Sequence, residues 1–409
     1  MDNPNYNPAF NQNVQAVIDE NLHEVLELEN KLSSSYVPEG LKEEAMRGVQ
    51  RLKRMFKMGG YSAEFETVSK YVDWITRIPW GVTSQDNFDI NHAKKLMDET
   101  HHGMETIKDL ILDYIATMQL QKMGGVRRES IPSQIPSQNN IPQGNYPPPS
   151  NPSPVHPEMA ILKGSSANAP VFLFLGLQGV GKTSIAKSIA TSMGRQFSRI
   201  SLGAIGDVRT LRGTPRYSPD AEPGQVVKSL IRCGTMNPVI LFDEIEKASR
   251  SSGLLSDVMA VLLEILDPEQ NSTFVDHYVD YPVDLSQVFF ICTANNLGGL
   301  SAALLDRVEV IRFTSYSDQE KEVIGKKYIL PRVLKNLNLS SDYVKIEDEV
   351  WPLIIRPVGF DAGIRQLERN VTSIVRSAAR MIVEGKPLPI VINSSNLSEY
   401  VLADQGPLS

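Results

Sequence analysis

The segment over residues 171–193 constrains the fold of this chain more than any other. The apolar run VFLFL is followed by the stretch GLQGVGKT at 176–183 and then by the helical sequence SIAKSIATSM. This glycine stretch fits the spacing G-x-x-x-x-G-K-T of a loop between a parallel strand and a helix. Its glycines let backbone N–H groups close around phosphates, and the helix N-terminus adds partial positive charge. A chance glycine turn is the alternative, but the flanking strand and helix disfavour it.

The loop predicts a site for a nucleoside triphosphate, ATP, with Mg²⁺. Lys182 is expected to reach the β- and γ-phosphates, and the Thr183 hydroxyl is expected to ligate Mg²⁺. The residues predicted to surround the phosphates are Gly176, Gln178, Gly179, Val180, Gly181, Lys182, Thr183 and Ser184.

Polar residues follow two later apolar runs. Asp243 and Glu244 come after VILF at 239–242, and Asn295 follows VFFICTA at 288–294. Ligands of parallel sheets bind at the carboxyl ends of strands, so these side chains are expected beside the phosphates. We predict that Asp243 holds the magnesium shell and that Glu244 polarises the attacking water. An acidic helix cap is the alternative for the carboxylates, and a turn is the alternative for Asn295.

Alternating strand and helix patterns extend over most of the C-terminal half. The apolar runs lie at 171–176, 199–202, 239–242, 288–294 and 308–313. They predict a doubly wound, mostly parallel α/β domain over 169–314. The pattern then becomes helical at 317–337, 350–355 and 363–383, with a short strand at 389–391. These elements predict a smaller helical domain over 315–409.

The first part of the chain, 1–123, is helical by pattern. Apolar residues recur at three- and four-residue steps over 14–32, 40–58, 64–78 and 106–121. Residues 124–168 are rich in Pro, Ser, Asn and Gln and predict a disordered linker. A polyproline ligand for a partner domain is the sharper alternative, although PPPSNP fits the P-x-x-P pattern poorly.

Composition narrows the partners and the compartment. The 409 residues carry a formal net charge of −7 and include two cysteines. The charge gives no support for nucleic-acid binding, and two distant cysteines disfavour a disulfide framework. No apolar run reaches the length of a membrane span, and no targeting segment is recognisable at either terminus. We therefore expect a cytosolic or nuclear protein that binds neither nucleic acid nor membrane.

These motifs, followed by a helical lid, resemble the AAA+ ATPases. The stretches GVGKTSIAKSIATSMGRQFSRISLG, LDPEQNSTFVDHY at 266–278 and AGIRQLER are similar to the ATPase module of Lon proteases. SAEFETVSKYVDWITRIPWG and DETHHGMETIKDLILDYIA resemble the helical region before that module. The resemblance covers about residues 15–123 and 169–402, so the implied fold class is an α/β P-loop AAA+ domain with helical regions on either side.

The resemblance implies roles for further residues. Arg307 in LLDRVEV matches an arginine finger that acts on the ATP of a neighbouring subunit, and Arg365 in AGIRQLER matches a sensor of the γ-phosphate. A surface salt bridge is the usual role of a lone arginine and is the alternative for both. The residues matching positions around the adenine are Tyr316, Ile324, His102 and Met104, with His102 standing where Lon has tyrosine.

Three departures from the Lon pattern bear on function. The chain ends after the lid, without the Ser-Lys peptidase or the N-terminal β-rich domain, so we expect no peptide-bond cleavage. In the segment 212–224, Ser218 and Pro219 stand at the positions of an aromatic–aliphatic pair that grips polypeptide, and Tyr217 lies one residue early. Either this loop is shifted by one residue, or it is a rigid proline turn without a threading role. The Pro-rich linker also replaces a short connection.

The leading hypothesis is an ATP-hydrolysing AAA+ protein that forms a homo-oligomeric ring, expected to be a hexamer, and remodels protein clients or serves a partner protease. The second hypothesis is an ATP-binding regulator or scaffold that threads no substrate, or that mixes into rings of a full-length relative. A truncated Lon without an independent role is a third.

Overall fold

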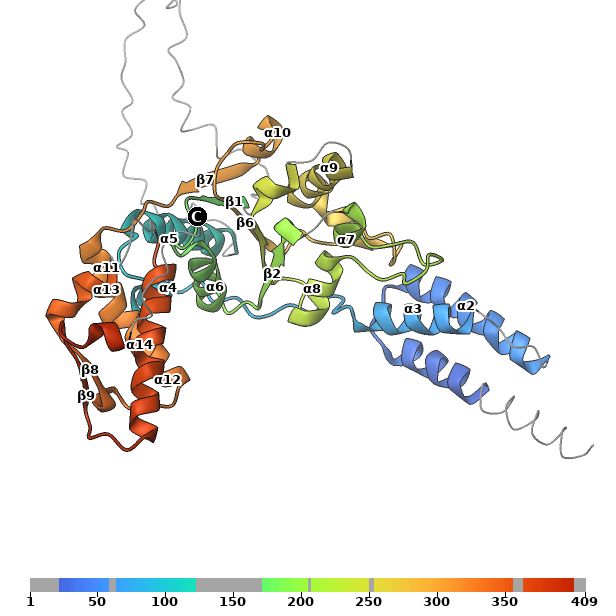
Figure 1. Cartoon of the computed structure of the whole chain (residues 1–409). Helices are drawn as coiled ribbons and strands as arrows, with labels where there is room; N and C mark the ends of the chain where they lie inside the picture. The colour runs from blue at the N-terminus through green and yellow to red at the C-terminus, as the bar shows by residue number, and fades with distance from the viewer. Residues whose placement is uncertain are drawn as a thin grey trace, which may run out of the picture.

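A parallel five-stranded sheet lies at the centre of the protein. The computed structural model describes residues 22–58, 64–122, 171–204, 207–249, 254–355 and 363–400. The strand order is β2-β3-β6-β1-β7 (Figure 1). The strands are β1 (Val171–Leu175), β2 (Phe197–Ser201), β3 (Val239–Asp243), β6 (Phe289–Ala294) and β7 (Val308–Arg312). Each strand overlaps one of the predicted apolar runs, so the predicted doubly wound parallel sheet is confirmed.

Helices cover both faces of the sheet. On β1 the odd-numbered residues enter one core and Phe172 and Phe174 enter the other, because side chains alternate along a strand. The first core is covered by α7 (Val208–Arg212), α8 (Gln225–Cys233) and α9 (Leu254–Leu266). The second is covered by α4 (Ile90–Thr100), α5 (Glu105–Lys122) and α6 (Lys182–Ser192). Both faces of the central strands are therefore buried, which explains their continuous apolar sequences.

The N-terminal region is helical, as predicted. It contains a helix over 22–34, then α2 (Glu39–Lys57), α3 (Phe65–Arg77), α4 and α5. Helix α4 was not predicted, because it is short and only Ala93 and Met97 among its residues are buried. The predicted start of the first helix, 14–21, and the predicted linker, 124–168, lie outside the described residues.

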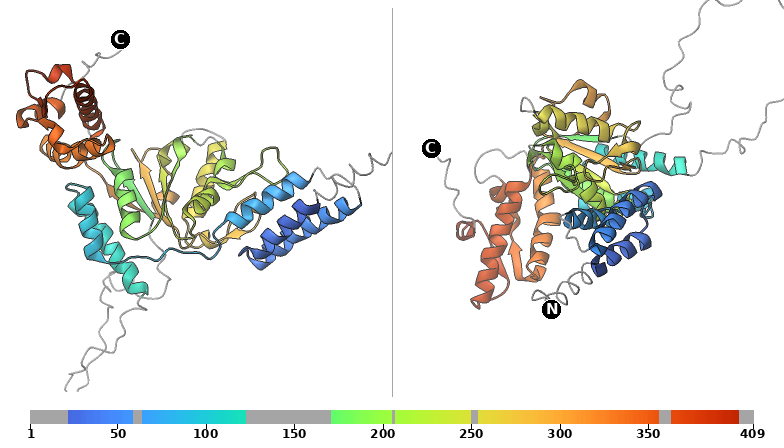
Figure 2. Two further views of the ribbon diagram at one scale, coloured as in Figure 1. Left: turned by 90° about the horizontal axis from the view of Figure 1, so that it is seen from below. Right: turned by 90° about the vertical axis from the view of Figure 1, so that its right-hand side faces the viewer.

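The N-terminal helices lie at different ends of the α/β domain, as the pair α2–α3, against which the helix over 22–34 packs, and the pair α4–α5. Figures 1 and 2 show α2 and α3 at one end, and α4 and α5 beside α6 at the other. Segment 79–89 connects the pairs along the sheet. The N–H of Met236 donates to the carbonyl of Val82 at 2.7 Å, and Asp86 accepts two hydrogen bonds from Arg195 at 2.7 and 3.0 Å. This connection is thus anchored to the α/β domain.

The C-terminal region is a small domain with its own core around Trp351. Its helices are α11 (Asp318–Ile324), α12 (Leu330–Asn336), α13 (Trp351–Ile355) and α14 (Arg365–Val383), and a π-helical turn over Gly325–Ile329 joins the first two. The predicted terminal strand is β9 (Ile390–Ile392), which pairs in parallel with β8 (Val344–Ile346), a strand that was not predicted. The helical lid is therefore confirmed, with a small sheet added.

Three short elements complete the α/β domain. These are β4 (Phe274–Val275), β5 (Pro282–Val283) and α10 (Ala302–Leu305), of which β4 and β5 pair antiparallel. Among the described helices, none is both long and apolar enough to span a bilayer.

Candidate functional site

The predicted site residues converge at the carboxyl ends of three adjacent strands. Strand β6 lies between β1 and β3 in the sheet. The glycine loop after β1, Asn295 after β6, and Asp243 and Glu244 at the end of β3 therefore share one edge. Gly179 and Gly181 have φ angles of +84° and +93°, a region that residues with side chains rarely adopt. The loop backbone thus requires glycine at these positions.

Lys182 lies at the centre of this edge. Its Nζ donates hydrogen bonds to the carbonyls of Gly176 and Leu177, the latter at 3.0 Å, and to Oδ1 of Asn295 at 3.2 Å. Burial lowers the pKa of Lys182, while the carboxylates of Asp243 and Glu246 act in the opposite direction. The structure thus brings the lysine and the polar strand end together.

The Asp243 carboxylate is held from two sides. The hydroxyl of Thr293 donates to Oδ1, and the Arg199 guanidinium lies 2.5 Å from Oδ2. Arg199 comes from the neighbouring strand β2 and was not predicted as a site residue. In the sequence it is one polar residue in an alternating strand, and nothing local marks its partner.

Glu244 follows directly and has an unusual backbone. Its φ angle is +61°, a left-handed conformation that is strained for a residue with a side chain. Its carboxylate pairs with Lys247 at 2.5 Å and accepts from Gln178 Nε2 at 3.5 Å. Its backbone N–H donates to the Thr293 hydroxyl at 3.0 Å, so Thr293 holds both the Asp243 carboxylate and the Glu244 backbone.

The lid contacts the glycine loop directly. The N–H of Ile364 donates to the carbonyl of Gly179 at 3.1 Å, and Nη1 of Arg365 donates to Oε1 of Gln178 at 3.0 Å. A Cβ atom at Gly363 would lie 2.6 Å from the carbonyl oxygen of Gln178. The predicted sensor Arg365 is thus placed on the phosphate loop by a close backbone approach.

Tyr316 and Met104 cover the other side of the loop. The Tyr316 hydroxyl donates to the carbonyl of Val180 at 3.0 Å. A Cβ atom at Gly181 would lie 3.1 Å from Cε of Met104 and 3.2 Å from the Tyr316 hydroxyl. Ile324 is buried in the core of the lid, one helix further along the chain.

His101, the neighbour of the predicted adenine-side residue His102, contacts the helix that follows the loop. Its Nε2 shares a hydrogen bond of 2.8 Å with the hydroxyl of Ser184, and its Nδ1 shares one of 2.9 Å with Thr100. Burial and then the positive charge of Lys108 lower the pKa of His101 to about 4, so the ring is neutral at physiological pH. His102 is half-buried beside it.

Arg307 lies away from this edge. Arg307 directly precedes β7. The glycine loop lies at the opposite end of that strand, where the N–H of Phe313 donates to the carbonyl of Leu175. The Arg307 guanidinium pairs with Asp267 at 3.0 Å and donates to the carbonyl of Ala303. A strand of five residues extends about 16 Å, so Arg307 does not reach the glycine loop of its own chain.

The oxygen ligands at the site suit Mg²⁺ bound together with a nucleotide. Mg²⁺ takes one or two protein oxygens and completes its shell with water and phosphate. Thr183 and Asp243 offer a hydroxyl and a carboxylate at this edge. Across the described ranges, no group of three or more His, Cys, Asp or Glu residues could hold a metal without a nucleotide.

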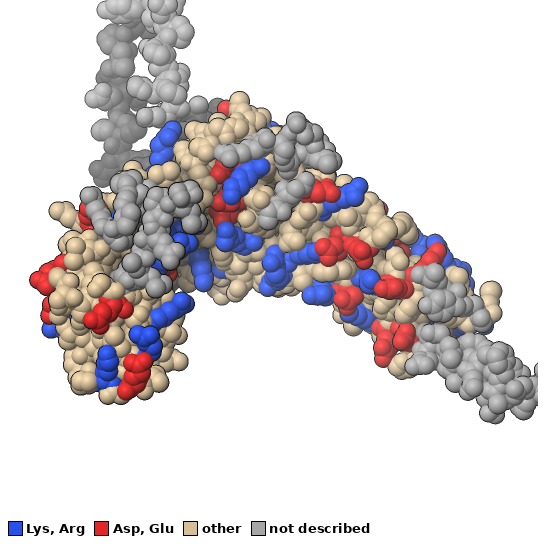
Figure 3. Space-filling model, viewed as in Figure 1, with Lys and Arg blue, Asp and Glu red and all other residues tan. Residues whose placement is uncertain are grey.

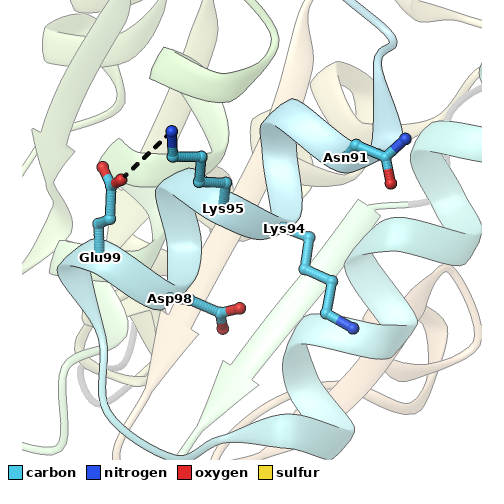
Figure 4. Close-up of a pocket in the computed structure, with 5 residues that line it drawn as sticks. All are labelled: Asn91, Lys94, Lys95, Asp98 and Glu99. Atoms are coloured by element: carbon cyan, nitrogen blue, oxygen red, sulfur yellow. Dashed lines mark ion pairs between the residues drawn. The ribbon is translucent and has the colours of Figure 1, made fainter.

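Two surface hollows among the described residues bear on where the site lies. One of about 550 Å³ adjoins the glycine loop and the ends of β6 and β7. The other, of about 430 Å³, is lined by five side chains of helix α4 alone (Figure 4). In that view Lys95 pairs with Glu99 on one side and Lys94 and Asp98 point to the other. No strand end or glycine loop lines the second hollow, so the first is the one that belongs to the site.

Comparisons with known proteins agree with this geometry. The AAA family model, described as ATPase family associated with various cellular activities, matches residues 172–316. The model of the Lon protease AAA+ ATPase lid domain matches residues 335–390.

Similar curated proteins carry the name Lon protease. The chain is 38% identical to Lon protease 2 of Thermus thermophilus over 383 residues, which is 94% of this chain and 43% of that protein. It is 38% identical to the Lon protease of Lawsonia intracellularis over 91% of this chain and 39% of that protein. It is 36% identical to Lon protease 1 of Bacillus subtilis over 92% of this chain and 43% of that protein. The chain thus spans about two fifths of the length of these relatives.

Proposed function

We propose that this chain, which carries an AAA+ ATPase module of the Lon family, hydrolyses ATP with Mg²⁺ at the carboxyl edge of its sheet. The observation that carries the proposal is the convergence of Lys182, Asn295 and the Asp243–Glu244 pair on adjacent strand ends. We propose that two domains carry out this reaction, the α/β domain over 169–314 and the lid over 315–409.

Each residue has a defined part in phosphoryl transfer to water. Lys182 and the loop N–H groups bind the β- and γ-phosphates, and Thr183 and Asp243 hold the Mg²⁺ shell. Bound Mg²⁺ neutralises charge on the phosphates. Glu244 orients and polarises the attacking water, and Asn295 supports its position. Catalysis then rests on positioning and on electrostatic stabilisation rather than on a covalent intermediate.

Two arginines extend the site beyond the loop. Arg365 lies on Gln178 of the loop and is placed to respond to the γ-phosphate. Arg307 lies too far from its own loop, so we propose that it acts on the nucleotide of a neighbouring copy. That role requires a ring, for which a hexamer is the proposed state.

The proposed output is the remodelling of protein clients, with a partner protease as one recipient. Proteolysis is a property named for the relatives and forms no part of this proposal. A second candidate is an ATP-binding regulator that threads nothing. The presence of Ser218 and Pro219, instead of an aromatic–aliphatic pair, favours it.

The deciding experiment is a steady-state ATPase assay with Mg²⁺. Glu244→Gln keeps the size of the side chain and removes its charge, so turnover should fall by about 10²-fold or more while ATP binding is retained. Glu99→Gln, an exposed carboxylate on α4, is the matched control and should leave turnover unchanged. Wild-type turnover no faster than that of Glu244→Gln would exclude the hydrolase.

The same assay across protein concentration tests the ring. If Arg307 acts between copies, turnover per chain rises with protein concentration, and Arg307→Ala removes that rise. Turnover per chain that is constant from dilute to concentrated protein, with a monomeric mass in the presence of ATP, would contradict the assembly.

A further inference from the structure

The segment between α7 and α8 carries the most exposed aromatic side chain of the described residues. We call residues 214–222 the finger. The N–H of Thr214 donates to the carbonyl of Glu222 at 3.1 Å, and the N–H of Glu222 donates back to the Thr214 hydroxyl at 3.0 Å. Tyr217 lies between these closing bonds and is 90% exposed. The finger is therefore closed at its base and presents a tyrosine to solvent.

The α/β domain fixes the base of the finger. Oδ2 of Asp276 accepts from the N–H of Gly224 at 2.8 Å, and Oδ1 accepts from Tyr278 and Val279 at 2.9 and 3.1 Å. A Cβ atom at Gly224 would lie 1.9 Å from the carbonyl oxygen of Leu211, so only glycine allows this approach of the two ends.

Arg216, the neighbour of Tyr217, points the other way. Its side chain is 16% exposed, and Nη2 lies 2.8 Å from Glu44 of α2 and 3.0 Å from Asp280. Its guanidinium also lies over the ring of Tyr71 in α3, 4.4 Å from the centroid. One side chain thus joins the finger to both helices of the N-terminal pair.

The ring under Arg216 is itself fixed. The Tyr71 hydroxyl donates to the carbonyl of Val279 at 3.1 Å, and the ring lies 6.0 Å from that of Tyr278. A second cation also connects the finger to α3. Lys228 of α8 pairs with Glu222 of the finger and lies 5.9 Å from the ring of Trp74 in α3. The finger is therefore held between the N-terminal helices and the segment 276–280.

We propose that Arg216 is a positioning residue through which the α2–α3 pair sets the direction of the finger. Tyr217 is then presented to an extended polypeptide in an orientation that depends on the N-terminal helices. The client class rests on the proposed function, whereas the positioning does not. A movement of α2 and α3 would redirect Tyr217 without any change at the ATP site.

The chemistry of arginine explains why this residue holds the finger. Its planar guanidinium can meet two carboxylates and lie flat on an aromatic ring, which a lysine ammonium cannot do together. Both carboxylates approach the same nitrogen, so removing the guanidinium leaves two like charges close together. Charged hydrogen bonds of this kind contribute about 1.5–3 kcal/mol each, which is enough to decide the conformation of a short loop.

Hydrogen exchange of the full chain tests the positioning. In Arg216→Ala, the bonded amides of Thr214, Ser218 and Glu222 should exchange roughly tenfold faster or more, because opening of the finger becomes easier. Arg216→Lys should recover part of the protection. Arg209→Ala, which removes an exposed arginine that pairs with nearby Asp207, is the control and should leave the finger unchanged.

A change on the far side of the contact separates positioning from a local effect. Glu44→Gln lies in α2, outside the finger, and should also accelerate exchange over 214–222. Exchange of the finger that is the same in wild type, Arg216→Ala and Glu44→Gln would overturn the proposal.

The client is tested with a fluorescein-labelled, permanently unfolded polypeptide. Tyr217→Ala and Arg216→Ala should each weaken its binding several-fold, with basal ATP turnover unchanged. If Arg216→Ala weakens binding while exchange of the finger stays slow, Arg216 contacts the polypeptide itself and the positioning role is wrong. If the wild type binds no polypeptide but exchange responds as expected, the positioning holds and the proposed client class is wrong.

Discussion

The two N-terminal helical pairs contact the α/β domain in different ways. Tyr114 of α5 stacks on Phe289 at 5.0 Å and packs edge-on against Phe172 at 5.3 Å, inside the core of the sheet. The α2–α3 pair instead meets the domain through aromatic rings and cations, as in Tyr71 against Tyr278 and Arg216 against Glu44. Figure 3 shows charges of both signs over α2 and α3, whereas Lys and Arg gather between this pair and the lid.

This difference assigns the pairs different tasks. A pair that supplies core side chains cannot separate from the sheet without unfolding it, so α4 and α5 are part of the nucleotide domain. The α2–α3 pair belongs to one continuous apolar cluster with the sheet but meets it at the edge, through rings and ion pairs, so it can shift at a smaller cost in free energy. The α2–α3 pair is therefore the region suited to respond to a partner.

The largest expected effect comes from breaking the connection between the pairs. Asp86 and Arg195 form a buried ion pair, each side chain being 4% exposed. Asp86→Ala leaves the guanidinium buried without its main partner and should lower the free energy of unfolding by about 3–5 kcal/mol. Urea unfolding followed by circular dichroism measures this loss.

Asp73→Ala in α3 is the control for that experiment, because Asp73 makes ion pairs and is half exposed. Its loss should be no more than about 1 kcal/mol. Equal losses for the two variants would mean that the connection is no stronger than a surface contact.

The contributions of the two regions to the free energy of unfolding should change with pH in opposite directions. Burial lowers the pKa of His101 beside α6 from 6.5 to about 4, so its unfolded form binds more protons and stability falls as the pH drops through this range. Burial raises the pKa of Asp276 at the finger base from 3.8 to about 6, against its backbone hydrogen bonds, so its contribution rises as the pH drops through that range. Each shift corresponds to roughly 3 kcal/mol.

Two variants separate these contributions. Between pH 6.5 and 4, His101→Gln should lose less stability than the wild type, and Asp276→Asn should lose more. Urea midpoints across this range measure both, and identical pH slopes in all three proteins would refute the assignment.

The smallest expected change in the free energy of unfolding comes from deleting one tyrosine hydroxyl in each region. The Tyr114 hydroxyl is buried without a hydrogen-bond partner among the described residues, so Tyr114→Phe should be neutral or stabilising by up to about 1 kcal/mol. Tyr71→Phe removes a bond to the carbonyl of Val279 and should destabilise by about 1 kcal/mol. Urea midpoints that move in the same direction would remove this contrast between the regions.

The strands of the sheet could be predicted from sequence because both of their faces are buried. Runs such as VFLFL carry the signal in every residue. Helix α4 buries little, and β8 has only three residues, so neither leaves a periodic pattern long enough to identify.

The site residues also divide into those that a local sequence motif predicts and those that only the tertiary fold brings together. The glycine loop and the Asp243–Glu244 pair are local motifs, so their common location follows from the strand order alone. His101 meets Ser184 across 83 residues, and Arg199 meets Asp243 from a neighbouring strand. Such partners depend on tertiary packing, which no local pattern records. The same holds for Arg216, whose contacts come from α2, α3 and the segment after β4.

Because Ile364 and Arg365 contact the glycine loop, docking of the lid and binding of a nucleotide are thermodynamically linked, and each affects the other. Any ligand that alters the position of the loop changes the free energy of docking the lid, and any load on the lid changes nucleotide affinity by the same factor. Two hydrogen bonds couple the lid to the loop, one from Ile364 to Gly179 and one from Arg365 to Gln178. A mechanical pull on the small domain would therefore be measurable as a change in the dissociation constant for ATP, and ATP would be measurable as a change in lid stiffness.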